Sequence, residues 1–254
     1  MRSGESSADV VFSGSPTQLA GKVYIVAGAT GGIGGAVARA LARCGAQLLL
    51  TGRDMRRLRS LADALAALGR SADDVELISA DLRERAAATV LIGRAAERFG
   101  RLDGVINAAG VGQLGRFLEV PAEDHLTQLG TNVEIAVRLS HASMEPLMRH
   151  RGIFVQVVSG LSSTVRKEAV VYGASQHAIA GLIQGLRAEV GGRGARLTLV
   201  SVGGAGVDTG FWDVALPRVD RKGMMGAAQV AATVLHAVTA PGSVQMDELR
   251  LRTP

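Results

Sequence analysis

The residues of this chain with the clearest chemical potential form a glycine-rich turn, Gly28-Ala29-Thr30-Gly31-Gly32-Ile33-Gly34. Glycines let a backbone turn sharply and approach a ligand without collisions at Cβ. A helical pattern follows, and the free N–H groups and positive dipole end of a helix N-terminus favour an anion. The spacing Gly-x-x-x-Gly-x-Gly differs from the Gly-x-Gly-x-x-Gly dinucleotide fingerprint. The turn therefore predicts a phosphate site, with a turn that binds nothing as the alternative.

The elements that would position this turn alternate between short apolar strands and amphipathic helices from Leu19 onward. The predicted strands are Val23–Val26, Gln47–Thr51, Val75–Ala80, Gly104–Asn107, Ile153–Ser159, Arg196–Val202 and, more weakly, Val244–Leu251. The predicted helices are 33–44, 55–68, 84–99, 122–149, 173–190 and 226–239. This alternation predicts parallel βαβ units in one doubly wound sheet with helices on both faces. Ligands bind at the carboxyl ends of such strands, so chemistry is expected just after each one.

Motifs at these strand ends and in the segments that follow them resemble, in order and near spacing, those of the short-chain dehydrogenase/reductase family. They are Gly28-x-x-x-Gly32-x-Gly34, Asp81-Leu82, Asn107-Ala108-Ala109-Gly110, Asn132, Ser159 and Tyr172. The resemblance covers about residues 19–252. With the alternating pattern it predicts an α/β fold, a single doubly wound Rossmann-type domain over 19–254 with a seven-stranded parallel sheet. The Ser- and Gly-rich segment 1–18 is predicted to be a flexible leader.

The resemblance implies that a nicotinamide dinucleotide binds along these strand ends. The glycines would line the pyrophosphate, Asp81 would hydrogen-bond the adenine amine, and residues 107–110 would separate adenosine from nicotinamide. Asp81 could equally cap the helix predicted near Arg83, because Asp suits that position. The candidate cofactor-binding residues are Gly28, Thr30, Gly31, Gly32, Ile33, Gly34, Arg53, Asp81, Leu82, Asn107, Ala108, Ala109, Gly110, Tyr172, Gln176, Gly204, Val207 and Thr209.

The end of the second strand, Leu50-Thr51-Gly52-Arg53-Asp54, bears on which nucleotide is bound. In sites that prefer NAD an acidic residue near this point binds the ribose 2′-hydroxyl, whereas an Arg accommodates a 2′-phosphate. By the resemblance, Gly52 stands at the acidic position and Arg53 at the basic one. A guanidinium can bind a phosphate with two hydrogen bonds. We therefore predict NADP(H) over NAD(H), with Asp54 capping the helix that follows.

The resemblance assigns catalysis to Ser159, Tyr172 and Asn132, with Tyr172 as the proton donor or acceptor and Ser159 polarising the substrate oxygen. The family has a Lys four residues after the Tyr, which binds the nicotinamide ribose and lowers the Tyr pKa. Gln176 stands at this position here, and Lys167 is a less favoured substitute for the missing cation. Ser175 is predicted to be an ordinary helix residue.

The exchange of Lys for Gln176 affects proton transfer more than binding. Bringing a Tyr pKa from near 10 toward 7 takes roughly 3–4 kcal/mol, which a neutral amide cannot supply. Gln176 can still hydrogen-bond a ribose hydroxyl. Oxidation of an alcohol needs a tyrosinate, but reduction of a carbonyl needs the protonated Tyr that is already present. The exchange therefore favours the reductive direction.

Three functions remain open at this point. The first is an NADP(H)-dependent carbonyl reductase with Tyr172 as proton donor. The second is a non-redox enzyme of the same fold, an isomerase, dehydratase or cyclase that uses Ser159 and Tyr172. The third is a catalytically silent nucleotide-binding protein. The intact Ser159 and Tyr172 argue against the third, and Gln176 argues against the first.

The segment 208–225 is predicted to be a substrate lid. At its start, Val207 and Thr209 best match the residues that contact the nicotinamide amide in the family. The lid contains Trp212 and Phe211 beside further apolar residues. This composition predicts an apolar or carbonyl-bearing small-molecule substrate, with ordinary lid packing as an equal alternative.

Composition narrows the classes of partner. The net charge is +5, but the basic stretches lack the interleaved aromatic residues of a single-strand nucleic-acid binder. No apolar run approaches the length of a membrane span, and the histidines show no metal-ligand spacing. The single cysteine, Cys44, fits a reducing cytoplasm. By the resemblance, the helices 122–149 and 173–190 would form a homodimer or homotetramer.

Overall fold

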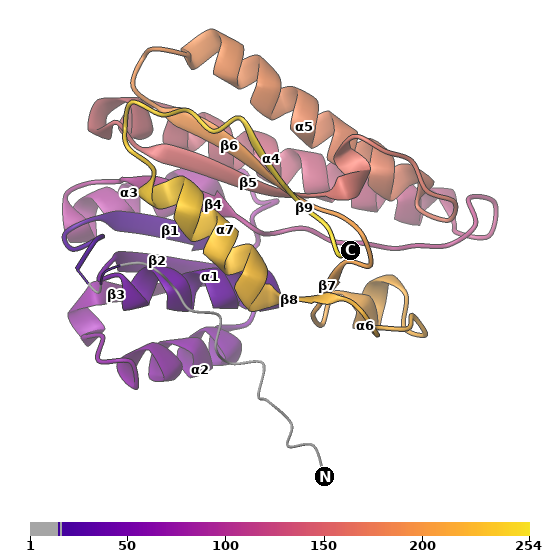
Figure 1. Ribbon diagram of the computed structural model, residues 1–254, viewed down its shortest axis with the longest axis horizontal. Coiled ribbons are helices and arrows are strands. Elements are labelled where there is room, and N and C mark those ends of the chain that lie inside the picture. The colour runs from indigo at the N-terminus through magenta and orange to yellow at the C-terminus, as the bar shows by residue number, and fades with distance from the viewer. Residues whose placement is uncertain (1–14, 16) are drawn as a thin grey trace.

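The computed structural model describes residue 15 and residues 17–254 (Figure 1), so most of the predicted leader over 1–18 lies outside the described residues. Seven parallel strands form one sheet in the order β3-β2-β1-β4-β5-β6-β9. They are β1 Val23–Ala27, β2 Gln47–Gly52, β3 Val75–Ser79, β4 Gly104–Asn107, β5 Ile153–Ser159, β6 Arg196–Val202 and β9 Glu248–Leu251. The order reverses beside β1, as in a doubly wound sheet. The predicted fold class is confirmed.

Helices cover both faces of this sheet, as Figure 1 shows. One layer contains α1 Gly32–Arg43, α2 Met55–Ala66 and α7 Ala227–Thr239, and the other contains α3 Ala87–Phe99, α4 Ala122–His150 and α5 Val170–Val190. Successive side chains of a strand point to opposite faces. Leu48 and Leu50 therefore pack against the first layer, and Leu49 against the second. Among the described residues, no helix combines the length and hydropathy needed to cross a membrane.

Several element boundaries differ from those predicted. The helix expected from residue 84 begins at Ala87, because Asp81 to Glu84 form a turn in which the Glu84 N–H donates to the Asp81 carbonyl. The last strand begins at Glu248 rather than Val244, since a turn with Val244 N–H donating to the Pro241 carbonyl precedes it.

The segment after β6 holds structure that the sequence pattern did not predict. A two-stranded sheet pairs β7 Val207–Asp208 with β8 Met225–Gly226, and between them lies the short helix α6 Trp212–Ala215. Two short 3-10 helices complete the fold, η1 Ala72–Asp74 and η2 Gly160–Ser162. The segment predicted as a lid is therefore tied at both of its ends by the pairing of β7 with β8.

A buried carboxylate joins the beginnings of β1 and β4. Asp103 accepts hydrogen bonds from the Val23 N–H at 3.0 Å, from Lys22 Nζ at 3.0 Å and from Arg101 at 2.7 Å. Burial by itself would raise the pKa of Asp103, but these hydrogen bonds outweigh it and hold the pKa below its usual range. Asp103 thus connects the two central strands on whose far ends the candidate site is built.

Candidate active site

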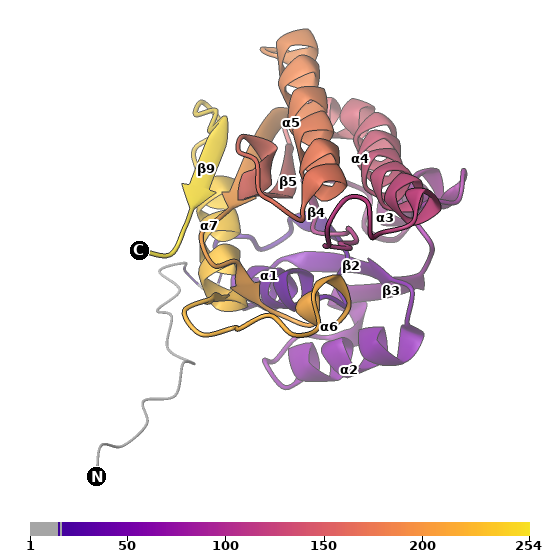
Figure 2. The same ribbon diagram turned by 90° about the vertical axis from the view of Figure 1, so that its right-hand side faces the viewer.

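The candidate residues gather at one edge of the sheet, because the parallel strands that precede them all end there. Figure 2 looks onto this edge, with α6 and the N-terminal ends of α4 and α5 around it. The site is therefore assembled from segments that are far apart in the sequence but follow neighbouring strands.

The glycine-rich turn between β1 and α1 is shaped by close backbone contacts. Gly28 has a φ of +76°, and a Cβ there would lie 2.8 Å from the Ala108 carbonyl oxygen. A Cβ on Gly34 would collide with the Gly28 carbonyl oxygen. The N-cap of α1 is Gly31, which has no side chain to cap the first N–H groups of the helix. This cradle fits a dinucleotide's diphosphate, since it offers free N–H groups, a positive dipole end and no Cβ in the way.

The segment after β4 is held beside this turn by Asn107, which is buried. Its side-chain nitrogen donates to Gln156 Oε1 at 2.9 Å, and its oxygen accepts from the Ala109 N–H at 3.1 Å. The Ala108 N–H in turn donates to the Ala27 carbonyl at the end of β1. The Asn107 amide is thus engaged within the protein, and its effect is to position the backbone of residues 108–110.

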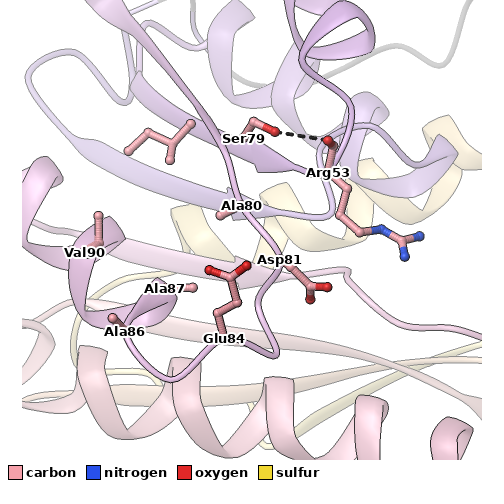
Figure 3. Close-up of a pocket in the computed structure, with 9 residues that line it drawn as sticks. Arg53, Ser79, Ala80, Asp81, Glu84, Ala86, Ala87 and Val90 are labelled. Carbon is pink, nitrogen blue, oxygen red and sulfur yellow. Dashed lines mark hydrogen bonds between the residues drawn. The ribbon is translucent and has the colours of Figure 1, made fainter.

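An open cavity of about 550 Å³ lies beyond the ends of β2 and β3 (Figure 3). Its lining residues are Arg53, Ile78, Ser79, Ala80, Asp81, Glu84, Ala86, Ala87 and Val90. The Arg53 guanidinium and the Asp81 carboxylate extend toward the same side in Figure 3. The predicted Leu82 contact is not among the cavity's walls, because Leu82 is buried in the core under the layer of α3 to α5. The cavity has the location expected for an adenosine.

Asp81 is paired with Arg83, whose Nη2 lies 2.6 Å from its carboxylate, and it also accepts from the Arg83 N–H at 3.0 Å. The hydrogen bonds from the Arg83 side chain, then from its backbone, lower the pKa of Asp81 to about 2, and the charge of Arg53 adds to this. Asp81 therefore shapes the turn at Arg83, as the capping alternative proposed, although the helix itself begins later. Asp54 accepts from the N–H groups of Arg56 and Arg57 and caps α2, which confirms that prediction.

The end of β2 has no room for an acidic side chain. A Cβ on Gly52 would lie 2.7 Å from both Oγ1 and Cγ2 of Thr30. The Thr30 side chain of the glycine-rich turn thus lies where a side chain at position 52 would begin. An aspartate at 52 would have to displace Thr30, whereas Arg53 faces the cavity without such a conflict.

The side chains of Asn132, Ser175 and Gln176 form a connected group of hydrogen bonds with the backbone of Ser159 and Tyr172. Gln176 Oε1 accepts from the Ser159 N–H at 2.9 Å, and Gln176 Nε2 donates to Ser175 Oγ at 3.4 Å. Asn132 Nδ2 also donates to Ser175 Oγ, at 3.1 Å, and Ser175 Oγ donates to the Tyr172 carbonyl at 2.7 Å. The structure therefore brings together the end of β5, the Asn132 region of α4 and the first turns of α5.

The phenol of Tyr172 lies in a position that keeps it protonated. Burial raises the pKa of Tyr172 to about 12, and an interaction with the Ser159 side chain offsets part of the rise. No charged side chain of the described residues contributes to this shift. Arg166 and Lys167 are exposed, as is His177, whose ring contacts the Gly173 carbonyl of its own helix. Lys167, which the sequence offered as a substitute for the family's lysine, therefore does not contribute to the change in the Tyr172 pKa.

The segment after β7 contacts both halves of the site. The Thr209 side chain lies against Gly32, with Cγ2 2.5 Å from the position of a Cβ there. Two residues later, the centroid of the Phe211 ring lies 5.8 Å from the centroid of the Tyr172 ring. One short stretch of chain therefore touches the glycine-rich turn and the tyrosine.

Other predicted contacts of this region are with the protein itself. Trp212 is buried, and its Nε1 donates to the Val207 carbonyl at 2.9 Å, so it packs the lid and does not form an open apolar surface. The side chain of Val207 belongs to the core. Gly204 lies against Thr253 near the C-terminus, where a Cβ would lie 2.5 Å from Thr253 Oγ1.

Sequence reasoning missed the part played by Ser175. Its hydroxyl is completely buried and links Asn132, which lies 43 residues away, to Gln176. No spacing rule joins these residues, because the contact arises only when α4 and α5 pack side by side. The one available signal was a small polar residue on the mostly apolar, buried face of a helix, where it needs hydrogen-bond partners.

Comparisons with known proteins identify the family and the fold. The family model described as "short chain dehydrogenase" matches residues 22–215. An uncharacterized oxidoreductase of Staphylococcus aureus is 30% identical over 237 residues, which are 93% of this chain and 99% of that protein.

Solved structures show the same fold. The alcohol dehydrogenase of the archaeon Thermococcus sibiricus, complexed with 5-hydroxy-NADP, superposes with a TM-score of 0.82 at 28% identity, over 91% of this chain and 96% of that one. A serine dehydrogenase complexed with NADP⁺ matches with a TM-score of 0.81 at 24% identity, over 90% and 94% of the two chains. With the family model covering most of the sequence, the chain belongs to the short-chain dehydrogenase family of oxidoreductases.

Proposed function

We propose that this protein reduces a carbonyl group with NADP(H), with Tyr172 as the proton donor and Ser159 polarising the substrate oxygen. The observation that carries the proposal is the segment from Thr209 to Phe211, which contacts Gly32 of the glycine-rich turn and the ring of Tyr172. A nucleotide on the turn and a substrate beside the two hydroxyls would therefore lie next to each other, bridged by this segment.

The proposed nucleotide is NADP(H) in preference to NAD(H). The uncapped start of α1 would hold the diphosphate, the backbone of residues 108–110 would form the adjacent wall, and Arg53 would bind the 2′-phosphate beside the cavity at β3. Two observations support the preference: Thr30 fills the place of an acidic residue at position 52, and the alcohol dehydrogenase at 28% identity was solved with 5-hydroxy-NADP. When bound, the reduced nicotinamide supplies the hydride.

The state of Tyr172 supports the reductive direction. With a pKa of about 12, roughly one phenol in 10⁵ is ionised at pH 7, so the proton is present for donation. The oxygen of a carbonyl substrate would accept a hydrogen bond from Ser159 and then the proton of Tyr172. Gln176, proposed to stand where the family has its lysine, engages one Nε2 hydrogen with Ser175 and would offer the second to a ribose hydroxyl.

The proposed substrate is an apolar molecule that carries a carbonyl group. Phe211 provides an aromatic wall next to Tyr172. The surrounding loops are joined by hydrogen bonds from the Leu114 N–H to the Ala215 carbonyl and from the Gly115 N–H to the Glu168 carbonyl. These loops carry apolar side chains in solvent, with Leu118 93%, Val165 92% and Val214 78% exposed. An apolar substrate would cover part of this surface.

We further propose a homodimer or homotetramer that forms through α4 and α5. The outer side of α5 carries small exposed residues, Ala174, Ala178, Gly181 and Gly185, at helical spacing, and these allow a second helix to approach closely. A cytoplasmic location is also proposed, and the single, buried Cys44 is consistent with a reducing compartment.

The test follows NADPH absorbance with a panel of aldehydes and ketones of increasing apolar size. We expect consumption of NADPH with at least one apolar carbonyl, and a loss of about 100-fold or more in kcat for Tyr172→Phe. Product formed without NADPH consumption would instead favour isomerisation, dehydration or cyclisation. Tight NADPH binding with no conversion of any compound would favour a silent nucleotide-binding protein.

A further inference from the structure

The side-chain oxygen of Gln176 is committed to a backbone group of the site. It accepts from the Ser159 N–H at 2.9 Å, and the side chain of Gln176 is only 6% exposed. The orientation of this amide is determined by chemistry, because a backbone N–H can only donate and must face the oxygen. Gln176 thus holds the backbone of the residue whose hydroxyl lies beside Tyr172.

Ser175 and Asn132 hold Gln176 in turn. A serine hydroxyl has one hydrogen and two lone pairs, and Ser175 uses all three on the Tyr172 carbonyl, Asn132 Nδ2 and Gln176 Nε2. The remaining groups of Asn132 bond the Val111 N–H at 2.8 Å and the Val111 carbonyl at 2.9 Å. A series of hydrogen bonds, buried at Asn132 and Ser175 and partly buried at its two ends, therefore runs from the loop after β4, through α4 and α5, to the end of β5.

A lysine cannot replace Gln176 in this series. An ammonium group has three donors and no acceptor, so the Ser159 N–H would lose the acceptor that it has here and would face a cation. A buried donor that loses its partner is costly, and the surrounding backbone shifts to find another. Gln176 thus makes a contact in this site that a lysine could not make.

We propose that Gln176 is a positioning residue for Ser159, whose backbone it fixes so that the Ser159 and Tyr172 hydroxyls meet at the substrate oxygen. Only the last part, that these hydroxyls act on a substrate, rests on the proposed function. The hydrogen bond to Ser159 joins two groups of the protein itself, so it can be tested separately from turnover.

The experiment compares four substitutions at one position. Gln176→Glu keeps an acceptor at the same reach, Gln176→Met keeps the length without an acceptor, Gln176→Asn keeps the amide but is one methylene shorter, and Gln176→Lys restores the family's cation. Hydrogen exchange of the Ser159 amide is measured in the nucleotide-free protein. In Gln176→Glu we expect the Ser159 amide to exchange as in the unmodified protein. In Gln176→Met, Gln176→Asn and Gln176→Lys we expect it to exchange at least about tenfold faster.

Turnover provides the second readout. With the carbonyl that the unmodified protein reduces, we expect Gln176→Met, Gln176→Asn and Gln176→Lys each to lose roughly 10- to 100-fold in kcat. Gln176→Glu is compared by hydrogen exchange alone, because it also removes the Nε2 donor to Ser175. Unchanged exchange at Ser159 in both Met and Asn would overturn the proposal, as would a kcat of Gln176→Lys above that of the unmodified protein. If the unmodified protein reduces no carbonyl, the proposed function fails while the exchange result still decides the role of Gln176.

Discussion

At the scale of single residues, Tyr172 determines the expected pH dependence. Burial places its pKa at about 12, so the protonated form that donates in reduction is complete well below that pH. We expect kcat for carbonyl reduction to be flat from about pH 7 to 10, and kcat for oxidation of the corresponding alcohol to rise about tenfold per pH unit as tyrosinate forms. Steady-state rates in both directions measure this. A group titrating near 7 in the oxidation profile, absent in Tyr172→Phe, would contradict it.

Arg53 is the residue whose charge we propose to decide between the two nucleotides. If it binds the 2′-phosphate, Arg53→Ala weakens NADPH binding by about tenfold or more and leaves NADH binding unchanged, because only NADPH carries that phosphate. Fluorescence titration of both nucleotides checks this. Arg56 lies nearby on α2 and its side chain is 93% exposed, so it provides the matched control. Arg56→Ala should change the affinity for neither nucleotide. Tighter binding of NADH than of NADPH by the unmodified protein would refute the preference itself.

At the scale of elements, the turn between β1 and α1 has no space for a Cβ at Gly34. The colliding atom is the Gly28 carbonyl oxygen, which is backbone and cannot rotate away. We expect Gly34→Ala to lower the free energy of unfolding by more than about 2 kcal/mol. Gly93 lies exposed within α3 with nothing within 4 Å of a Cβ, so Gly93→Ala should raise it by about 0.5–1 kcal/mol. Urea titrations of both variants give the comparison, and equal effects would contradict it.

The hydrogen bonds of Asp103, at the other end of β1 and β4, predict that the stability of the fold falls in acid. Since the pKa of Asp103 is lower in the folded than in the unfolded chain, its stabilisation is present above the usual carboxyl range and is lost as pH falls through the folded value. Asp103→Asn should lower the free energy of unfolding at pH 7 by about 1–3 kcal/mol, a range reduced because Lys22 and Arg101 are partly exposed. The variant should also lose less stability than the unmodified protein between pH 7 and about 3. Denaturant titrations at the two pH values test this, and parallel losses would argue against it.

At the scale of the whole molecule, the exposed small residues of α5 predict self-association. Gly181 has nothing within 4 Å of a Cβ in the single chain, so a larger side chain there fits the monomer and obstructs only a partner helix. Light scattering should show a dimer or tetramer for the unmodified protein and a smaller species for Gly181→Glu. Gly93→Glu, an equally exposed change on α3, should leave the mass unchanged. A monomeric unmodified protein would refute this assembly.

The prediction of the fold succeeded because it depended on local and strongly patterned signals. Apolar runs such as Gln47–Gly52 are buried on both faces, and the helices between strands have the length of crossover units, so the sheet and its layers follow from periodicity. Boundaries were less accurate where turn bonds compete with helix or strand, as at Asp81 and at Pro241. The β7–β8 pair escaped prediction because strands of two residues carry no period.

The sequence by itself determined the class of the protein: a doubly wound domain with a glycine-rich turn, Ser159 at the end of a later strand, and Tyr172 and Gln176 in the segment that follows. Tertiary structure alone decided what those residues contact. It directs the Gln176 oxygen to the Ser159 N–H, places Thr30 against Gly52, and packs Trp212 into the lid. The physical reason is that hydrogen bonds and steric contacts between distant segments depend on how helices and strands pack, to within a few tenths of an ångström. Residue types and spacing do not specify that packing.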